Sequence, residues 1–192
     1  DTLSQIESYI EENPDSALVI LEQIDLSELS GKEEKAKHAL LYSMALDKNF
    51  VDKTDFEVLQ PAIDYYGDNG SATDKLRTYY YQGRIYQNMG NDALAMESFV
   101  NAIPVGEKSD DVLTIARIHF AQSKIYYSLF DWDNFIECNK NAAHFFKEVG
   151  AINSYANCLI RIINGYTLKE NQDNALRYIE KCKHLLSSIS QN

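Results

Sequence analysis

The residues best suited to acid–base or metal chemistry are thinly spread along this chain. There is no H-E-x-x-H and no C-x-x-C, and G-x-G-x-x-G, P-loop and nucleophile-elbow motifs are absent from the sequence. Carboxylates are plentiful, but most stand at predicted helix starts or exposed positions. The sequence therefore predicts no catalytic residue, no metal site and no cofactor. The histidines are His38, His119, His144 and His184, and the cysteines are Cys138, Cys158 and Cys182.

The overall charge narrows the range of partners. The chain has 192 residues with 29 acidic against 18 basic side chains, which gives a formal net charge of −11. Such a charge opposes unspecific binding to phosphate backbones and anionic membranes. No apolar run approaches the roughly 18 residues that a membrane-spanning helix needs. We therefore expect no nucleic acid partner and no transmembrane segment in this chain.

A pattern of small and aromatic residues recurs every 40 residues. A fixed period of this size indicates a stacked array of repeats, with each repeat packed on its neighbours. The chain has only 3 prolines and 8 glycines, which favours long helices over strands and turns. The matching segments are Gly83 to Ala102, Ser123 to Ala142 and Ile163 to Cys182, with helix-start residues Asn91, Asp131 and Asn171.

Each period reads as two helices joined by a tight turn, because apolar residues recur at helical spacing between N-cap residues and Gly or Pro. Gly90 is predicted to be the left-handed residue that follows a helix, and Pro104 is predicted to end the next helix. Pro61 is predicted to kink or shorten an earlier helix. The predicted helices are 3–10, 14–24 (with Asn13 as N-cap), 74–89, 112–129, 132–149, 152–168 and 175–189. The predicted units are a helix pair over 1–30 and repeats over 33–70, 73–108, 112–149 and 152–190.

The segment from Tyr79 to Ala102 resembles the tetratricopeptide repeat. Its aromatic-x-x-x-Gly-x-x-Tyr run and the later Ala-x-x-x-Phe-x-x-Ala fill six signature positions of that family. The period of 40 exceeds the family's usual 34, and Phe135 stands where the family has a small residue. The resemblance implies a single all-α domain, a right-handed superhelix of about ten helices stacked as antiparallel pairs. It also implies a protein-binding role without enzymatic activity.

In that family the first helix of each pair faces a concave groove, and five positions of that helix point inward. Among the 20 matching positions here, six are basic and one is acidic. Arginine binds carboxylates bidentately, and neighbouring aromatic rings supply rigid contact. The resemblance therefore implies that the groove holds an acidic or carboxylate-bearing segment of a protein or peptide. The expected groove residues are Lys37, Arg77, Tyr80, Arg84, Gln87, Asn88, Arg117, Phe120, Lys124, Tyr127, Asn157 and Asn164.

Other interpretations stay open on the sequence alone. The segment Ile6 to Ile24 resembles the start of repeat proteins of Bacteroides-type bacteria, which implies a lipoprotein or membrane-anchored regulator of the periplasm or cell envelope. In that setting the chain would be a domain that senses a ligand or peptide. An enzyme or a nucleic-acid-binding protein has less support. Because Leu185, Leu186 and Ile189 keep the last helix apolar, we expect a longer protein or a partner that contacts that helix.

Overall fold

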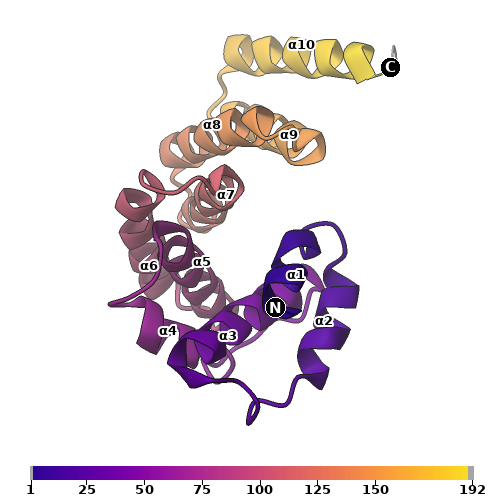
Figure 1. Cartoon of the computed structure of the whole chain (residues 1–192). Helices are drawn as coiled ribbons and strands as arrows, with labels where there is room; N and C mark the ends of the chain where they lie inside the picture. Colours follow the sequence, from indigo (N-terminus) through magenta and orange to yellow (C-terminus); the bar gives the residue numbers. More distant parts are fainter. Residues whose placement is uncertain (1, 190–192) are drawn as a thin grey trace. The chain divides into compact units, whose positions relative to one another are not determined.

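The computed structural model describes residues 2–189, and all regular secondary structure in that range is helical (Figure 1). Successive helices pack against each other as hairpins, which confirms the predicted all-α architecture of helix pairs. The described helices are α1 (Thr2–Tyr9), α2 (Pro14–Gln23), α3 (Gly31–Lys48), α4 (Gln60–Tyr66), α5 (Ala72–Asn88), α6 (Asp92–Gly106), α7 (Val112–Ser128), α8 (Trp132–Glu148), α9 (Ile152–Leu168) and α10 (Gln172–Ile189). Residue 190 and the side chain of Ile189, which fall in the last predicted repeat, lie outside the described part.

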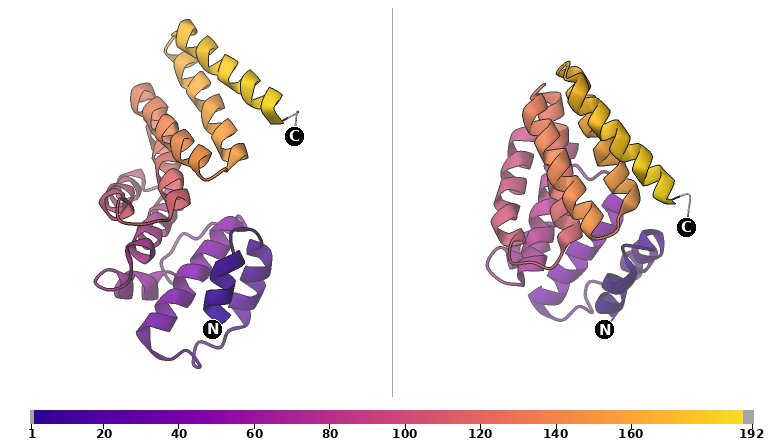
Figure 2. Two further views of the ribbon diagram at one scale, coloured as in Figure 1. Left: turned by 45° about the horizontal axis from the view of Figure 1, so that its top comes forward. Right: turned by 90° about the horizontal axis from the view of Figure 1, so that it is seen from above.

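The chain forms two compact units that part between Ser109 and Asp110. The N-terminal unit contains α1 to α6, and in it α3 packs against α1, α2, α4 and α5. The C-terminal unit contains α7 to α10, and in it α8 packs on both α7 and α9, while α9 packs on α10. Figure 2 shows the hairpins of each unit from two further directions. Each unit is therefore held together by its own set of helix interfaces.

Side-chain caps start the helices at the predicted repeat positions. The side-chain oxygens of Asn91, Asp131 and Asn171 each accept a hydrogen bond from the backbone N–H three residues further on, at 3.1 to 3.2 Å. These bonds satisfy N–H groups that lack a partner in the first turn of a helix. Ser71 and Asp74 form a reciprocal capping box at the start of α5. All three predicted repeat caps are thus confirmed, and the helices begin in phase with the sequence period.

The hairpins α3/α4, α5/α6, α7/α8 and α9/α10 show the same period in the backbone after their first helix. Phe50, Gly90, Phe130 and Glu170 all have positive φ, between 55° and 73°, and stand 40 residues apart. A left-handed residue of this kind commonly ends a helix, and glycine takes the conformation without steric cost. Only one of these four residues is a glycine, so the turn geometry repeats even where the sequence does not favour it. The predicted role of Gly90 is confirmed.

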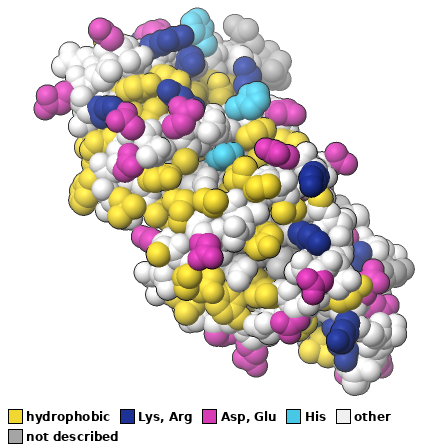
Figure 3. All heavy atoms as spheres, turned by 90° about the vertical axis from the view of Figure 1, so that its left-hand side faces the viewer, with side chains coloured by type: hydrophobic (Ala, Val, Ile, Leu, Met, Phe, Trp, Pro, Cys, Tyr) yellow, Lys and Arg dark blue, Asp and Glu magenta, His cyan; other side chains and the backbone are white. Residues whose placement is uncertain are grey.

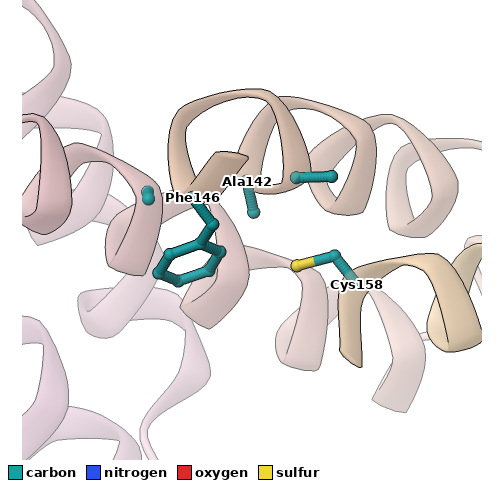
Figure 4. Packing of buried hydrophobic residues seen from close by; sticks show 5 residues of the cluster. Ala142, Phe146 and Cys158 are labelled. Atoms are coloured by element: carbon teal, nitrogen blue, oxygen red, sulfur yellow. The ribbon is translucent and has the colours of Figure 1, made fainter. Parts of the chain in front are cut away.

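Small residues allow the helices of a pair to approach closely. A Cβ atom on Gly83 of α5 would lie 2.4 Å from the ring of Phe99 on α6, which is too close for any real contact. Phe99 is fully buried, as are Ala95 and Ala102 of the same signature. In the C-terminal unit, Ala142 and Phe146 of α8 lie next to Cys158 of α9 (Figure 4). The signature residues therefore build the core, as the repeat pattern predicts.

The predictions for two prolines need correction. Pro104 does not end its helix, because α6 continues to Gly106 with Pro104 inside its last turn. Pro61 was expected to kink or shorten the fourth helix from within, but it lies in the first turn of the seven-residue α4. Proline has no N–H to donate, and the first turn is the place where none is needed. Asn13 precedes α2 as predicted but makes no side-chain cap bond.

Candidate functional site

The titratable side chains do not converge on a reactive centre in the described part of the chain. Across residues 2–189, no group of three His, Cys, Asp or Glu side chains is placed to hold a metal ion. Burial raises the pKa of the Cys138 and Cys158 thiols to about 12, so both stay protonated at neutral pH and are poor nucleophiles. His119 stacks on Phe145 at 5.8 Å, and burial lowers its pKa, as expected for a packed histidine.

The cations predicted for the groove of the N-terminal unit lie on their predicted helices but are paired within that unit. Glu7 of α1 accepts from both Lys37 of α3, at 3.0 Å, and Arg77 of α5, at 2.8 Å. Burial would raise the pKa of Glu7, but the hydrogen bonds and charges of these two partners outweigh it and hold the pKa below its usual value. Lys37 and Arg77 are therefore brought together by the chain's own carboxylate.

Arg84 is likewise matched to a carboxylate of the same unit. Its Nε donates to Asp47 Oδ1 at 3.0 Å, and its Nη1 donates to Gln87 at 3.0 Å. Burial disfavours the charge of Arg84, but Asp47 outweighs it, so the arginine pKa is raised. Asn88 donates to the backbone carbonyl of Lys53 at 3.1 Å, so its amide is also paired within this unit.

Tyr80 does not line an open surface. Its side chain is only 6% exposed, and its ring packs against Tyr81 at 4.9 Å and Phe99 at 6.3 Å. In the N-terminal unit, then, some of the predicted groove residues are buried in the core, and others form ion pairs with carboxylates of the same unit.

The C-terminal unit brings three of the predicted residues around one cleft. A cleft of about 200 Å³ lies among α7, α8 and α9, and Arg117 and Phe120 face it from α7 while Asn157 faces it from α9. Leu113 and Phe146 add apolar walls. Arg117 and Asn157 stand one repeat of 40 residues apart in the sequence, and both line this cleft.

Arg161 of α9 is the residue of this site that the sequence analysis missed. Its Nε donates to Asn139 Oδ1 at 3.1 Å and its Nη2 to Ser123 Oγ at 3.2 Å. Its guanidinium lies over the rings of Phe120, at 4.8 Å, and Phe135, at 5.1 Å. Hydrogen bonds and ring contacts therefore both hold the guanidinium in place.

Arg161 differs from Arg84 in its electrostatic environment. Burial lowers the pKa of Arg161, and among residues 2–189 no carboxylate forms an ion pair with it. Its hydrogen-bond partners are a neutral amide and a neutral hydroxyl. A partly buried cation that is held only by neutral groups is well suited to bind an anion, because the anion would supply the missing charge.

Further predicted residues extend this surface along the same helices. Lys124 lies over the Phe120 ring at 5.7 Å, and Tyr127 is half exposed beside Trp132, at 5.5 Å between ring centroids. Asn164 is exposed on α9. We name this surface the α7/α9 face, and it comprises Arg117, Phe120, Lys124, Tyr127, Asn157, Arg161 and Asn164.

The charge of the α7/α9 face contrasts with that of the whole protein. Neither α7 nor α9 contains an aspartate or glutamate, although acidic residues outnumber basic ones in the chain. Figure 3 shows one side of the molecule, on which acidic side chains lie among basic and hydrophobic ones. The two helices therefore carry only positive charge within a strongly negative molecule.

Comparison with known proteins adds no family name to these observations. No model of a known protein family matches the sequence, and no curated protein matches it either. Within the described residues, the helices are too short or too polar to cross a membrane.

Proposed function

We propose that this protein is a non-enzymatic binding protein whose α7/α9 face holds an acidic or carboxylate-bearing segment of a protein partner. The observation that carries the proposal is the environment of Arg161. Its guanidinium is oriented by Asn139 and Ser123, flanked by two phenylalanine rings, and has no carboxylate partner in the described part of the chain. The resemblance to the tetratricopeptide repeat supports the same kind of function.

The surroundings of Arg161 indicate what a ligand would contain. A carboxylate would pair with the guanidinium, while an adjacent apolar side chain would fit the cleft between Leu113, Phe120 and Phe146. Asn157 and Asn164 provide amide groups that can both donate to and accept from a peptide backbone. An acidic residue or terminal carboxylate next to an apolar residue is therefore the expected recognition element.

The first test measures binding of short fluorescent peptides that contain aspartate or glutamate beside leucine or phenylalanine, with free or amidated C-termini. We expect Arg161→Gln to weaken binding at least about tenfold, because truncating one partner of a buried charge pair leaves the other unpaired. Arg177→Gln is the matched control, since it removes the same charge from an exposed position on α10. Fluorescence anisotropy provides the dissociation constants.

The outcomes separate the possibilities clearly. Equal loss in both variants would mean that the peptide responds only to overall charge, and unchanged binding by Arg161→Gln would reject the α7/α9 face. If only peptides with a free C-terminus bind, the ligand is a terminal carboxylate. If amidated peptides bind equally well, it is an internal acidic residue. Failure of every acidic peptide to bind would reject the proposal.

A further inference from the structure

The inner stripe of α3 in the N-terminal unit is covered, although the sequence predicts that it lines an open groove. The stripe consists of Lys37, Leu40, Met44 and Lys48, which share one side of the helix by their spacing. Leu40 and Met44 are only 3% and 2% exposed. The lysines at both ends pair with carboxylates from the N-terminal segment, Lys37 with Glu7 and Lys48 with Glu11.

The segment that makes these contacts is α1 with the turn that follows it. Leu3, Ile6 and Ile10 are buried to 2% or less, and α1 packs against α3. Ser4 accepts a further hydrogen bond from Lys37, and Glu7 reaches across to Arg77 on α5. We infer that α3 and α5 form a receptor surface for an acidic amphipathic helix, and that α1 is a resident occupant that a partner helix of the same pattern displaces.

The pattern of α1 defines the chemistry of that partner. Leu3 and Ile6 of α1 and Ile10 of the following turn are buried, and the acidic residues are Glu7 within α1 and Glu11 in that turn. The three cations that receive these acids, Lys37, Lys48 and Arg77, are fixed on two long helices. A partner helix therefore needs two carboxylates four residues apart in its sequence, beside apolar residues spaced as Leu3, Ile6 and Ile10 are.

The short length of α1 makes exchange feasible. A helix of eight residues has little stability of its own, so α1 depends on its contacts with α3 and α5. Ordering these residues costs conformational entropy that offsets much of the gain from burying three apolar side chains. The following Asn13-Pro14 sequence separates α1 from α2, which has its own anchor on α3 through the bond between His38 and the Leu21 carbonyl.

Hydrogen exchange on the wild-type chain tests whether α1 opens alone. We expect the amides of α1 to exchange at least about tenfold faster than those of α8, through a local opening that leaves α8 closed. Exchange of α1 only through global unfolding would overturn the inference, since α1 would then be an inseparable part of the unit. This measurement requires no substitution and so does not depend on whether a variant folds.

A labelled peptide with the sequence of residues 1–12 tests whether the surface accepts an external helix. Glu7→Lys/Glu11→Lys weakens the resident helix, and Glu12→Lys/Glu22→Lys is the control with the same charge change at exposed positions. We expect the first variant to bind the peptide at least about tenfold more tightly than either the wild type or the control. A peptide with lysine at the positions of Glu7 and Glu11 should not bind. Absence of binding to a folded variant whose α1 exchanges rapidly would overturn the inference.

The inference concerns residues outside the α7/α9 face, so it can fail separately from the proposed function. Repeating the peptide titration with Arg161→Gln added to the first variant distinguishes the two surfaces. Unchanged binding supports the site on α3 and α5. Loss of binding would show that the peptide sits on the α7/α9 face and would overturn the assignment to the N-terminal unit.

Discussion

At the scale of single residues, what distinguishes the cations of this protein is the group that each one faces. Arg84 has Asp47 beside it and a raised pKa, whereas Arg161 faces amide, hydroxyl and ring atoms and has a lowered pKa. Both side chains are partly buried, so burial acts on both in the same direction. Asp47 makes the largest contribution to reversing the sign of the shift at Arg84. Arg84 is thus neutralised within the fold, while Arg161 still has a charge available to a ligand.

Glu7 gives a prediction about pH at this scale. Its pKa is lowered in the folded state by Lys37 and Arg77, so its ionised form stabilises the fold. This contribution is fully present above the ordinary carboxyl pKa and is lost as the pH falls through the lower folded value. We expect Glu7→Gln to reduce the free energy of unfolding by roughly 1 kcal/mol at pH 7. The difference between variant and wild type should shrink below about pH 4.

Urea denaturation at several pH values measures this effect, and Glu12→Gln serves as control because Glu12 is exposed and lies next to the same segment. A Glu7→Gln penalty that stays constant between pH 3 and pH 7 would contradict the assigned role of the carboxylate charge.

At the scale of elements, the hairpins α3/α4, α5/α6, α7/α8 and α9/α10 each have one left-handed residue after their first helix. Glycine occupies this position once, while phenylalanine or glutamate occupies it in the other three hairpins. A side chain in the left-handed conformation costs energy that glycine avoids. The position therefore contributes strain in three of these hairpins and none in the fourth, although all four have a left-handed residue after the first helix.

This comparison predicts opposite effects of two substitutions. Glu170→Gly should raise the free energy of unfolding by about 1 kcal/mol, and Gly90→Ala should lower it by a similar amount. A Cβ on Gly90 would meet no other atom within 4 Å, so the expected loss comes from the backbone alone. Thermal or urea unfolding measures both effects. Glu170→Ala is the control, and a stabilisation as large as that of Glu170→Gly would show that charge rather than φ is responsible.

At the scale of the whole molecule, local and total charge have opposite signs. The net charge of −11 repels an acidic partner at long range, while the cations of the α7/α9 face attract it on contact. Salt screens the long-range repulsion as the Debye length falls from about 30 Å at 0.01 M to about 8 Å at 0.15 M. Association and dissociation should therefore respond to salt for different reasons.

We expect the association rate of an acidic peptide to increase over this range of salt, because screening removes repulsion from the approach. The dissociation rate should increase as well, because the contact pairs are weakened. Stopped-flow fluorescence separates the two rates, and an uncharged peptide of the same length is the control. An association rate that falls with salt would show that local attraction governs the approach.

Much of the architecture could be predicted from the sequence, because its determinants are local. Caps such as Asn91 and Asp131 act within three residues, and the small and aromatic residues of each hairpin recur at a constant period. The prediction of a helix end failed where a proline is compatible with two local structures. Pro104, for example, stands near the end of α6, and a proline there does not by itself decide whether the helix stops or continues for another half turn.

The amino-acid sequence by itself determined the helices, their pairing and the presence of cations on one face of the first helices, since spacing along a helix sets which residues share a face. Only the tertiary structure decided which cations meet a carboxylate. Glu7 lies 70 residues from Arg77, and Ser123 lies 38 residues from Arg161. Contacts between residues so far apart in the sequence depend on how the helices pack. The spacing of residues along one helix does not determine whether a cation on it is neutralised by a carboxylate or remains available to a partner.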